Sequence, residues 1–131
     1  MTDNKRDLKV AIAGLGQVGT TFLRKFADKI GTGVEIVAVA EINKDAPGIE
    51  LAKDKGINVV NDPKELVAMG EEIDIIFDLT GNEDAKKAMR SDLARSGNQY
   101  TALVPEVVAY LLWNLMDGST VLPEKHGKIG Y

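Results

Sequence analysis

The 131 residues of this chain are enough for one globular domain, and an apolar fraction of 44% with a charged fraction of 27% is ordinary for a water-soluble protein. A formal net charge of −4 disfavours nucleic acid and anionic membranes as partners, and no apolar run approaches the roughly 20 residues that span a bilayer. With no cysteine and one histidine, spacing defines no metal site, disulfide or cysteine nucleophile, and we expect a cytoplasmic protein.

Short runs of β-branched apolar residues alternate along the chain with helical stretches, which is typical of a parallel sheet with helices on both faces. The helices are recognised by apolar residues at every third or fourth position and by glycine, proline and capping residues at their ends. In chain order the sequence predicts a strand at residues 9–13, a helix from 17 to about 29, a strand at 35–40, a helix at 49–55, a strand at 57–60, a helix at 63–70, a strand at 73–79, a helix at 83–95, a strand at 99–104 and a helix at 105–116.

The order of the strands follows from the handedness of their connections. Parallel strands joined through helices form right-handed crossovers, and this rule favours the order 3-2-1-4-5. We therefore predict an α/β, Rossmann-like domain over residues 9–116, with a parallel sheet of about five strands. Residues 1–8 are expected to be a flexible lead-in, and residues 117–131, which have no clear apolar period, a C-terminal tail.

A glycine-rich turn links the first strand to the first helix, with the sequence Gly14-Leu15-Gly16-Gln17-Val18-Gly19. Between a strand and a helix, this spacing is the fingerprint of dinucleotide binding. Gly14 is expected to allow the tight turn, Gly16 to let the backbone approach a pyrophosphate, and Gly19 to let the helix pack closely. The phosphates would bind to free N–H groups at the start of the helix, around Gln17 and Val18.

An acidic residue, Glu41, ends the second strand about 20 residues after Gly19, the separation at which such folds carry the acid that binds the adenosine ribose. A carboxylate there accepts hydrogen bonds from the ribose hydroxyls and repels the 2′-phosphate of NADP, so the predicted cofactor is NAD. Lys44 is the one nearby residue that favours NADP. The alternative is a Rossmann-like domain that has lost its ligand, with Glu41 only a solvated strand end.

The loop after the fourth strand, Thr80-Gly81-Asn82, is the third predicted part of the site. Ligands of open parallel sheets lie at the carboxyl ends of the strands, so this loop is expected to border the nicotinamide-side ribose. Alternatively, Thr80 or Asn82 simply caps the next helix, and the two roles are compatible. Asp78 is expected to bond to backbone N–H groups rather than to act as a general base.

Residues 10–19, 37–41 and 78–82 resemble the N-terminal domain of the glucose-fructose oxidoreductase and inositol dehydrogenase family, and homoserine and aspartate dehydrogenases share the pattern. The resemblance covers about residues 9–104 and implies a Rossmann fold that binds NAD(P). Residues 45–49, with the Ala-Lys-Asp-Lys-Gly that follows them, are also similar to Rossmann modules attached to bacterial sensor kinases.

Two departures from this family bear on activity. Its members carry Glu-Lys-Pro after the fifth strand, with a lysine that assists catalysis, whereas this chain has Leu103-Val104-Pro105-Glu106. Glu124-Lys125-His126 is similar in letters but follows an extra helix, so we interpret it as a chance match and His126 as a solvated residue. No second domain with substrate contacts is expected either, so the resemblance implies a cofactor and no particular reaction.

The predicted function is an NAD(H)-binding module that is non-catalytic on its own, as a redox-sensing, regulatory or cofactor-holding subunit. The alternative is a dehydrogenase whose substrate site is completed by a second subunit or chain. It would need a proton donor near the nicotinamide, for which Asp78, Lys125 and His126 are the only candidates. A third reading is an adaptor that keeps the fold for protein contacts alone.

The helix opened by Pro105 is apolar around nearly its whole circumference, with Val107, Val108, Ala109, Tyr110, Leu111, Leu112, Trp113, Leu115 and Met116. The sheet can bury only one side of this helix, and a large apolar patch on a small soluble protein usually marks an interface. We therefore predict a homodimer through residues 105–116. The alternative is that Val121, Leu122 and Ile129 of the tail fold back over the helix.

Overall fold

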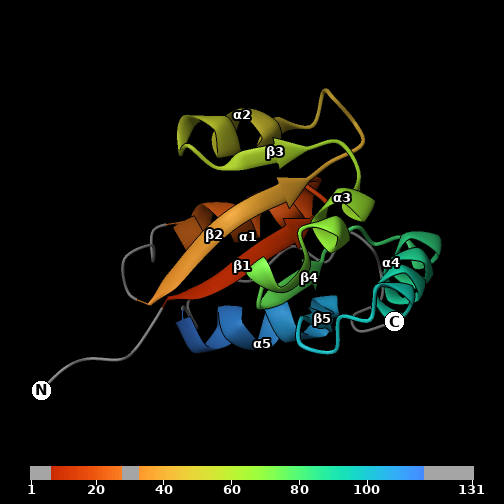
Figure 1. The fold of residues 1–131 in the computed structure, drawn as a ribbon. Helices are drawn as coiled ribbons and strands as arrows, with labels where there is room; N and C mark the ends of the chain where they lie inside the picture. The colour runs from red at the N-terminus through yellow and green to blue at the C-terminus, as the bar shows by residue number, and fades with distance from the viewer. Residues whose placement is uncertain (1–6, 28–32, 117–131) are drawn as a thin grey trace, which may run out of the picture.

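The computed structural model describes residues 7–27 and 33–116 (Figure 1). Each predicted strand and helix has a counterpart in it. The elements in chain order are β1 (Leu8–Ala13), α1 (Gln17–Ala27), β2 (Val34–Ala40), α2 (Pro47–Asp54), β3 (Asn58–Val60), α3 (Pro63–Ala68), the 3-10 turn η1 (Gly70–Glu72), β4 (Ile75–Asp78), α4 (Glu83–Ser96), β5 (Ala102–Val104) and α5 (Glu106–Met116).

The strands form one parallel sheet in the order β3-β2-β1-β4-β5, which confirms the prediction (Figure 1). The central strand is β1, in which Ile12 pairs with Val39 of β2 on one side and with Phe77 of β4 on the other. The chain runs outward from β1 to β3 and then returns to add β4 and β5 on the opposite side. All carboxyl ends therefore meet at one edge, and the strand order reverses there between β1 and β4.

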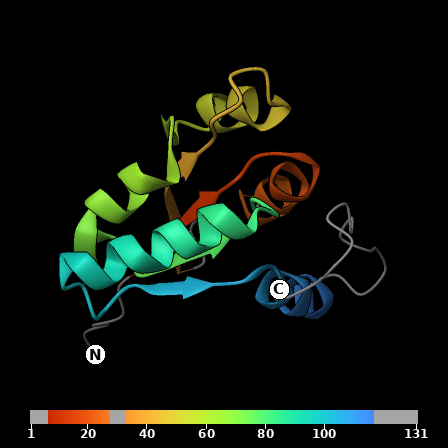
Figure 2. The same ribbon diagram turned by 90° about the vertical axis from the view of Figure 1, so that its right-hand side faces the viewer.

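Helices cover both faces of the sheet and bury two apolar clusters (Figure 2). On one face, the side chains of α1 and α5 pack over the sheet, and Phe22 lies 4.7 Å from Phe26 and 5.1 Å from Phe77 between ring centroids. On the other face, Leu66 of α3 and Met89 of α4 pack against the small alanine side chains of β1 and β2. Burial on both faces explains why these strands are almost continuously apolar.

Two strands begin later than predicted because the preceding residues form turns. β5 begins at Ala102 instead of residue 99, since the Oδ1 atom of Asn98 accepts the N–H groups of Tyr100 (2.9 Å) and Thr101 (3.1 Å) and closes a turn. β4 begins at Ile75 instead of residue 73, since η1 and the bend after it occupy the residues before the strand.

At the other ends the differences are small. β1 begins at Leu8, which pairs with Val34, so the strand extends one residue into the expected lead-in. α2 begins at Pro47, two residues before the predicted helix at 49–55, because proline has no N–H to leave unpaired at the first helical position. The end of the first helix, predicted near residue 29, lies outside the described residues. So does the whole tail 117–131, which contains Val121, Leu122, Lys125, His126 and Ile129. Within the described ranges, no helix has the length and apolar character needed to cross a membrane.

Candidate functional site

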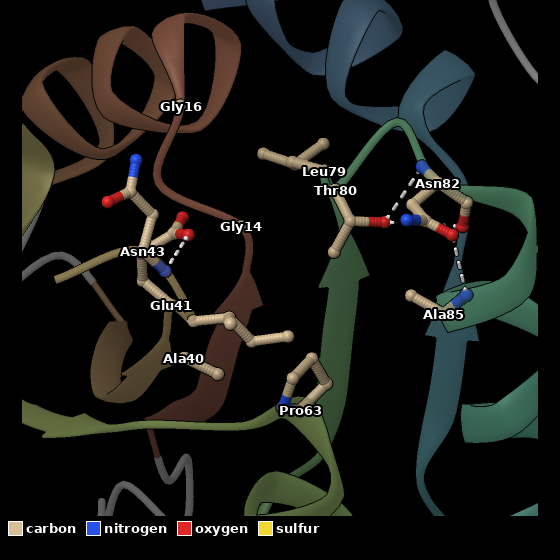
Figure 3. A pocket seen from close by; sticks show the side chains of 11 residues that line it. Gly14, Gly16, Ala40, Glu41, Asn43, Pro63, Leu79, Thr80, Asn82 and Ala85 are labelled. Atoms are coloured by element: carbon tan, nitrogen blue, oxygen red, sulfur yellow. Dashed lines mark hydrogen bonds between the residues drawn. The ribbon is translucent and has the colours of Figure 1, made fainter. Parts of the chain in front are cut away.

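The carboxyl ends of β1, β2 and β4 surround a cleft of about 340 Å³ (Figure 3). It lies at the edge where the strand order reverses, which is where open parallel sheets bind their ligands, and its volume is that of a small-molecule site. The lining residues are Gly14, Gly16, Ala40, Glu41, Ile42, Asn43, Pro63, Leu79, Thr80, Asn82 and Ala85.

The three glycines of the turn between β1 and α1 have different roles. Gly14 has a φ of +99°, and a Cβ atom there would lie 2.8 Å from backbone atoms of Leu79 and Thr80. A Cβ atom on Gly19 would lie 1.8 Å from the carbonyl oxygen of Gly14. Gly16 has no positive φ, and a Cβ atom there would meet nothing within 4 Å. The fold therefore requires glycine at positions 14 and 19, whereas position 16 borders open space.

The amino end of α1 lies at this same edge. The N–H group of Thr20 is the first to bond within the turn, at 2.9 Å from the carbonyl oxygen of Gly16. The N–H groups of Gln17, Val18 and Gly19 precede it and have no partner inside the helix, and the helix dipole adds positive potential there. The side chain of Val18 is fully buried in the core, so this residue offers a ligand only its backbone.

Glu41 follows β2, and its carboxylate lies against the glycine turn. Its Oε1 atom accepts the N–H of Leu15 at 2.5 Å, and Oε2 accepts the N–H of Asn43 at 2.9 Å (Figure 3). A carboxylate has about four acceptor positions, so about two remain for hydroxyl groups in the cleft. Glu41 thus has a role that its spacing in the sequence does not indicate, since it also holds the glycine turn against the end of β2.

Asp78 and Thr80 organise the loop after β4. The Oδ1 atom of Asp78 accepts the N–H of Thr80 at 3.1 Å and its hydroxyl at 2.7 Å, and the Thr80 oxygen accepts the N–H of Asn82 at 3.1 Å. Asn82 Oδ1 accepts the N–H of Ala85 at 3.0 Å and so caps α4 (Figure 3). Gly81 supplies the turn with a φ of +65°. Asn82 therefore has the predicted capping role and, like Thr80, also lines the cleft.

Most of the predicted cofactor residues come together in this cleft. Gly14, Gly16, Glu41, Thr80 and Asn82 all line it. The other predicted residues lie around it: Gln17 faces a second cleft, Val18 and Gly19 are buried beneath the turn, and Gly81 shapes the loop without lining either cleft.

Sequence reasoning missed the apolar residues of the cleft. Ile42, Pro63, Leu79 and Ala85 come from the segments that follow β2, β3 and β4 and from the first turn of α4. Of these residues, only Ile42 could have been predicted from the sequence, because it is a large apolar residue directly after Glu41, the acid at the end of the second strand. Its side chain is 69% exposed, which is unusual for isoleucine and fits a surface that a ligand covers.

A second cleft, of about 460 Å³, lies between α1 and the start of α2. Gly16, Glu41 and Asn43 line both clefts, so the glycine turn separates two hollows that meet at Glu41. Arg24 of α1 is the basic side chain in the second cleft. Lys44, which the sequence analysis identifies as the residue favouring NADP, lines neither cleft.

Two carboxylic side chains near this edge are buried, Asp78 at the end of β4 and Glu106 at the start of α5, each 1% exposed. Asp78 bonds to the backbone of Thr80, as expected, while its Oδ2 atom has no hydrogen-bond partner among the described residues. Glu106 follows β5, at the position where the family that the sequence resembles carries Glu-Lys-Pro, and it is not among the candidates expected from the sequence. No group of three or more histidine, cysteine or acidic side chains is placed to hold a metal in the described part of the chain.

No protein-family model and no curated protein matches this sequence. Among solved structures, S. aureus homoserine dehydrogenase matches with a TM-score of 0.59 and 17% identity, over 93% of this chain and 32% of that one. Apo scyllo-inositol dehydrogenase from Lactobacillus casei matches with a TM-score of 0.51 and 17% identity, over 82% of this chain and 39% of that one. The fold is a Rossmann-like α/β fold. At this identity the likeness confirms the fold that the sequence resemblance implies, and the chain spans less than two fifths of either protein.

Proposed function

We propose that this chain binds NAD(H) in the cleft at the carboxyl edge of its sheet and transfers no hydride on its own. The observation that carries the proposal is the open space beside Gly16. The fold does not require a glycine at position 16. A ligand that approaches the backbone of the turn does require one, because a side chain would occupy its space. The free N–H groups at the start of α1 lie next to this space and suit a pyrophosphate.

The remaining residues of the cleft fit the adenosine half of the dinucleotide. The two free acceptor positions of Glu41 suit the hydroxyls of one ribose. Thr80 and Asn82 share the cleft with Glu41, so we place them beside the adenosine half and not beside the nicotinamide-side ribose that the sequence analysis expects. The second cleft, beyond Glu41, is where a 2′-phosphate would extend.

The absence of hydride transfer is proposed from the position of the acids. A group that exchanges a proton with a substrate must come within hydrogen-bond reach of it. Among the described residues, Asp78 and Glu106 are the acids at the ends of β4 and β5, and both are almost completely buried. The other two candidates, Lys125 and His126, lie outside the described residues. A redox-sensing, regulatory or cofactor-holding subunit needs no such group, and we propose that the chain acts in one of these roles.

The proposal is tested by titrating the protein with NADH and following the fluorescence of the nicotinamide. Wild-type protein should bind, and Gly16→Val should lose at least tenfold in affinity, because its side chain fills the space that the ligand needs. The thermal unfolding temperature of Gly16→Val should stay close to that of the wild type, because position 16 borders open space.

Gly19→Ala is the matched control, because it adds a smaller side chain to the same turn. Its Cβ atom would collide with the carbonyl oxygen of Gly14, so this variant should lose stability and not only binding. If Gly16→Val binds NADH with the same affinity as the wild type, the ligand must bind elsewhere. No NADH binding by the folded wild type would leave the adaptor as the remaining function.

A further inference from the structure

The second cleft, between α1 and the start of α2, has a volume of about 460 Å³, which is ordinary for a small-molecule site (Figure 1). The proposed NAD(H) complex does not use this cleft, because NAD(H) carries no 2′-phosphate to extend into it. Its lining combines amide, hydroxyl, guanidinium and carboxylate side chains. This chemistry suits a small polar ligand.

Two oppositely charged side chains line the second cleft without meeting. Arg24 comes from α1 and Asp45 from the segment before α2, and both are exposed. The backbone N–H of Asp45 bonds to Asn43 Oδ1 at 3.0 Å, and this bond does not use the carboxylate. Within the described ranges, no hydrogen bond or ion pair engages either the guanidinium of Arg24 or the carboxylate of Asp45. One cation and one anion are therefore available at the same cleft.

The other polar groups of the cleft are largely used within the chain. The hydroxyls of Thr20 and Thr21 donate to backbone carbonyl oxygens at 2.7 and 2.8 Å, so they present only acceptor positions to a ligand. Glu41 accepts two backbone N–H groups and, in the proposed complex, the ribose hydroxyls. Arg24 and Asp45 are thus the charges that remain for a ligand of the second cleft.

A zwitterion complements this pair of charges. A ligand carboxylate can accept two parallel N–H bonds from the guanidinium of Arg24, and a ligand ammonium can donate to the carboxylate of Asp45. A phosphate fits less well, because it would meet the carboxylates of Glu41 and Asp45 against one cation. A quaternary ammonium also fits less well, because no aromatic side chain is among the described residues that line this cleft.

We propose that the second cleft binds a free α-amino acid, with its carboxylate on Arg24 and its ammonium on Asp45. Ala46 and Pro47 give the cleft apolar surface, so the side chain of the amino acid is small and uncharged. Neither Arg24 nor Asp45 lines the cleft assigned to NAD(H), so this proposal does not rest on nucleotide binding. Because the two clefts share Gly16, the amino acid and the nucleotide would lie next to each other.

The test titrates the full chain with L-alanine in the absence of nucleotide and follows the backbone amide signals by NMR. We expect saturable binding, with the largest shifts along the outer side of α1 and at the start of α2. Three analogues each lack one feature of the ligand: propanoate has no ammonium, ethylammonium has no carboxylate, and glycine betaine has no N–H. Each should bind at least tenfold more weakly than L-alanine.

Arg24→Gln and Asp45→Asn each remove one charge from the cleft. Each should weaken the binding of L-alanine at least tenfold without lowering the unfolding temperature, because neither side chain is engaged by another described residue. Arg90→Gln and Asp54→Asn are the matched controls, since both residues are exposed and line neither cleft. They should leave the affinity for L-alanine unchanged.

The outcomes separate this proposal from the function proposed above. No saturable binding of L-alanine by the folded wild type overturns it and leaves the NAD(H) module standing. Binding of propanoate or ethylammonium as tight as that of L-alanine shows a site for one charge only and also overturns it. An equal loss of L-alanine binding in the control variants would exclude Arg24 and Asp45 as specific partners. Binding of L-alanine without binding of NADH supports this proposal and removes the other.

Discussion

Glu41 is the residue that should separate NAD from NADP. In the proposed complex the free acceptor positions of Glu41 face the ribose hydroxyls. A 2′-phosphate in the second cleft would meet two carboxylates, Glu41 and Asp45, against one cation, Arg24. We therefore expect the wild type to bind NADH at least tenfold more tightly than NADPH. Tenfold corresponds to about 1.4 kcal/mol, which one charge-assisted hydrogen bond and one repulsion can supply. Direct titration with each reduced cofactor measures the difference.

Substitution of Glu41 distinguishes its two roles. Glu41→Gln removes the charge and keeps an oxygen for one backbone N–H, whereas Glu41→Ala removes the bonds to both Leu15 and Asn43. Both variants should reduce the difference in affinity between NADH and NADPH. Only Glu41→Ala should also weaken the binding of both cofactors, because it loosens the glycine turn. Equal affinity of the wild type for the two cofactors would exclude Glu41 from the ribose site.

Whether a site residue can be predicted from the sequence depends on how local its role is. The glycines and Glu41 obey spacings that belong to one strand–helix–strand unit, β1-α1-β2, so the sequence is sufficient for them. Pro63 reaches the cleft only because α3, which it begins, packs against α4. Gly48 lies before the helix that the sequence predicts at 49–55, yet a Cβ atom there would lie 2.5 Å from Thr20 Oγ1, because α2 packs closely on α1.

At the scale of elements, the cap of α4 has a measurable effect. Asn82→Ala removes the oxygen that accepts the N–H of Ala85, and loss of an N-cap costs about 1 kcal/mol. We expect the unfolding temperature to fall by about 3–6 °C in a domain of this size. Differential scanning calorimetry of the free protein checks this value.

Asn82→Asp is the control for that measurement. It keeps an oxygen that can cap α4 and removes the amide donor of Asn82 from the cleft, so stability should be retained while nucleotide affinity falls. If Asn82→Asp destabilises the protein as much as Asn82→Ala, the capping hydrogen bond is not the source of the loss.

The elements themselves were predictable and some of their ends were not. Alternating apolar runs and helical stretches, with the crossover rule, are enough to predict the strand order that the structure has. The start of β5 depends instead on Asn98, whose side chain takes two N–H groups that the apolar pattern assigns to the strand. Such side-chain bonds compete with the sheet, and the apolar pattern does not reveal which of them form.

At the scale of the whole molecule, the purified chain should show no hydride transfer. With NAD⁺ and amino acids, sugars or 2-hydroxy acids, the formation of NADH should stay at background, because the acids at the ends of β4 and β5 are buried. Absorbance of the reduced nicotinamide at saturating cofactor measures it. Turnover above background that Gly16→Val abolishes would favour the dehydrogenase completed by a second subunit or chain.

The apolar surface of α5 divides into two sides in the structure. Ala109 and Trp113 are buried against the sheet, and Leu112 packs against the same cluster. On the opposite side, Val107 (43% exposed), Leu111 (56%) and Leu115 (75%) recur at every fourth position and form one exposed stripe. The sheet therefore buries one side of this helix, as predicted from the sequence, and leaves the stripe on the other side exposed.

This stripe leads us to predict that the chain is a homodimer through α5. Leaving large aliphatic side chains in water forgoes roughly 1.5–3 kcal/mol of burial for each, and two copies related by a two-fold axis would cover both stripes at once. Sedimentation equilibrium at micromolar concentration should give the mass of a dimer.

Leu111→Glu should give a folded monomer, whereas Leu112→Glu should lower stability because it disturbs the core. Ile42→Glu, an equal change at an exposed isoleucine away from α5, should remain dimeric. A monomeric wild type would contradict the prediction and favour coverage of the stripe by residues 117–131.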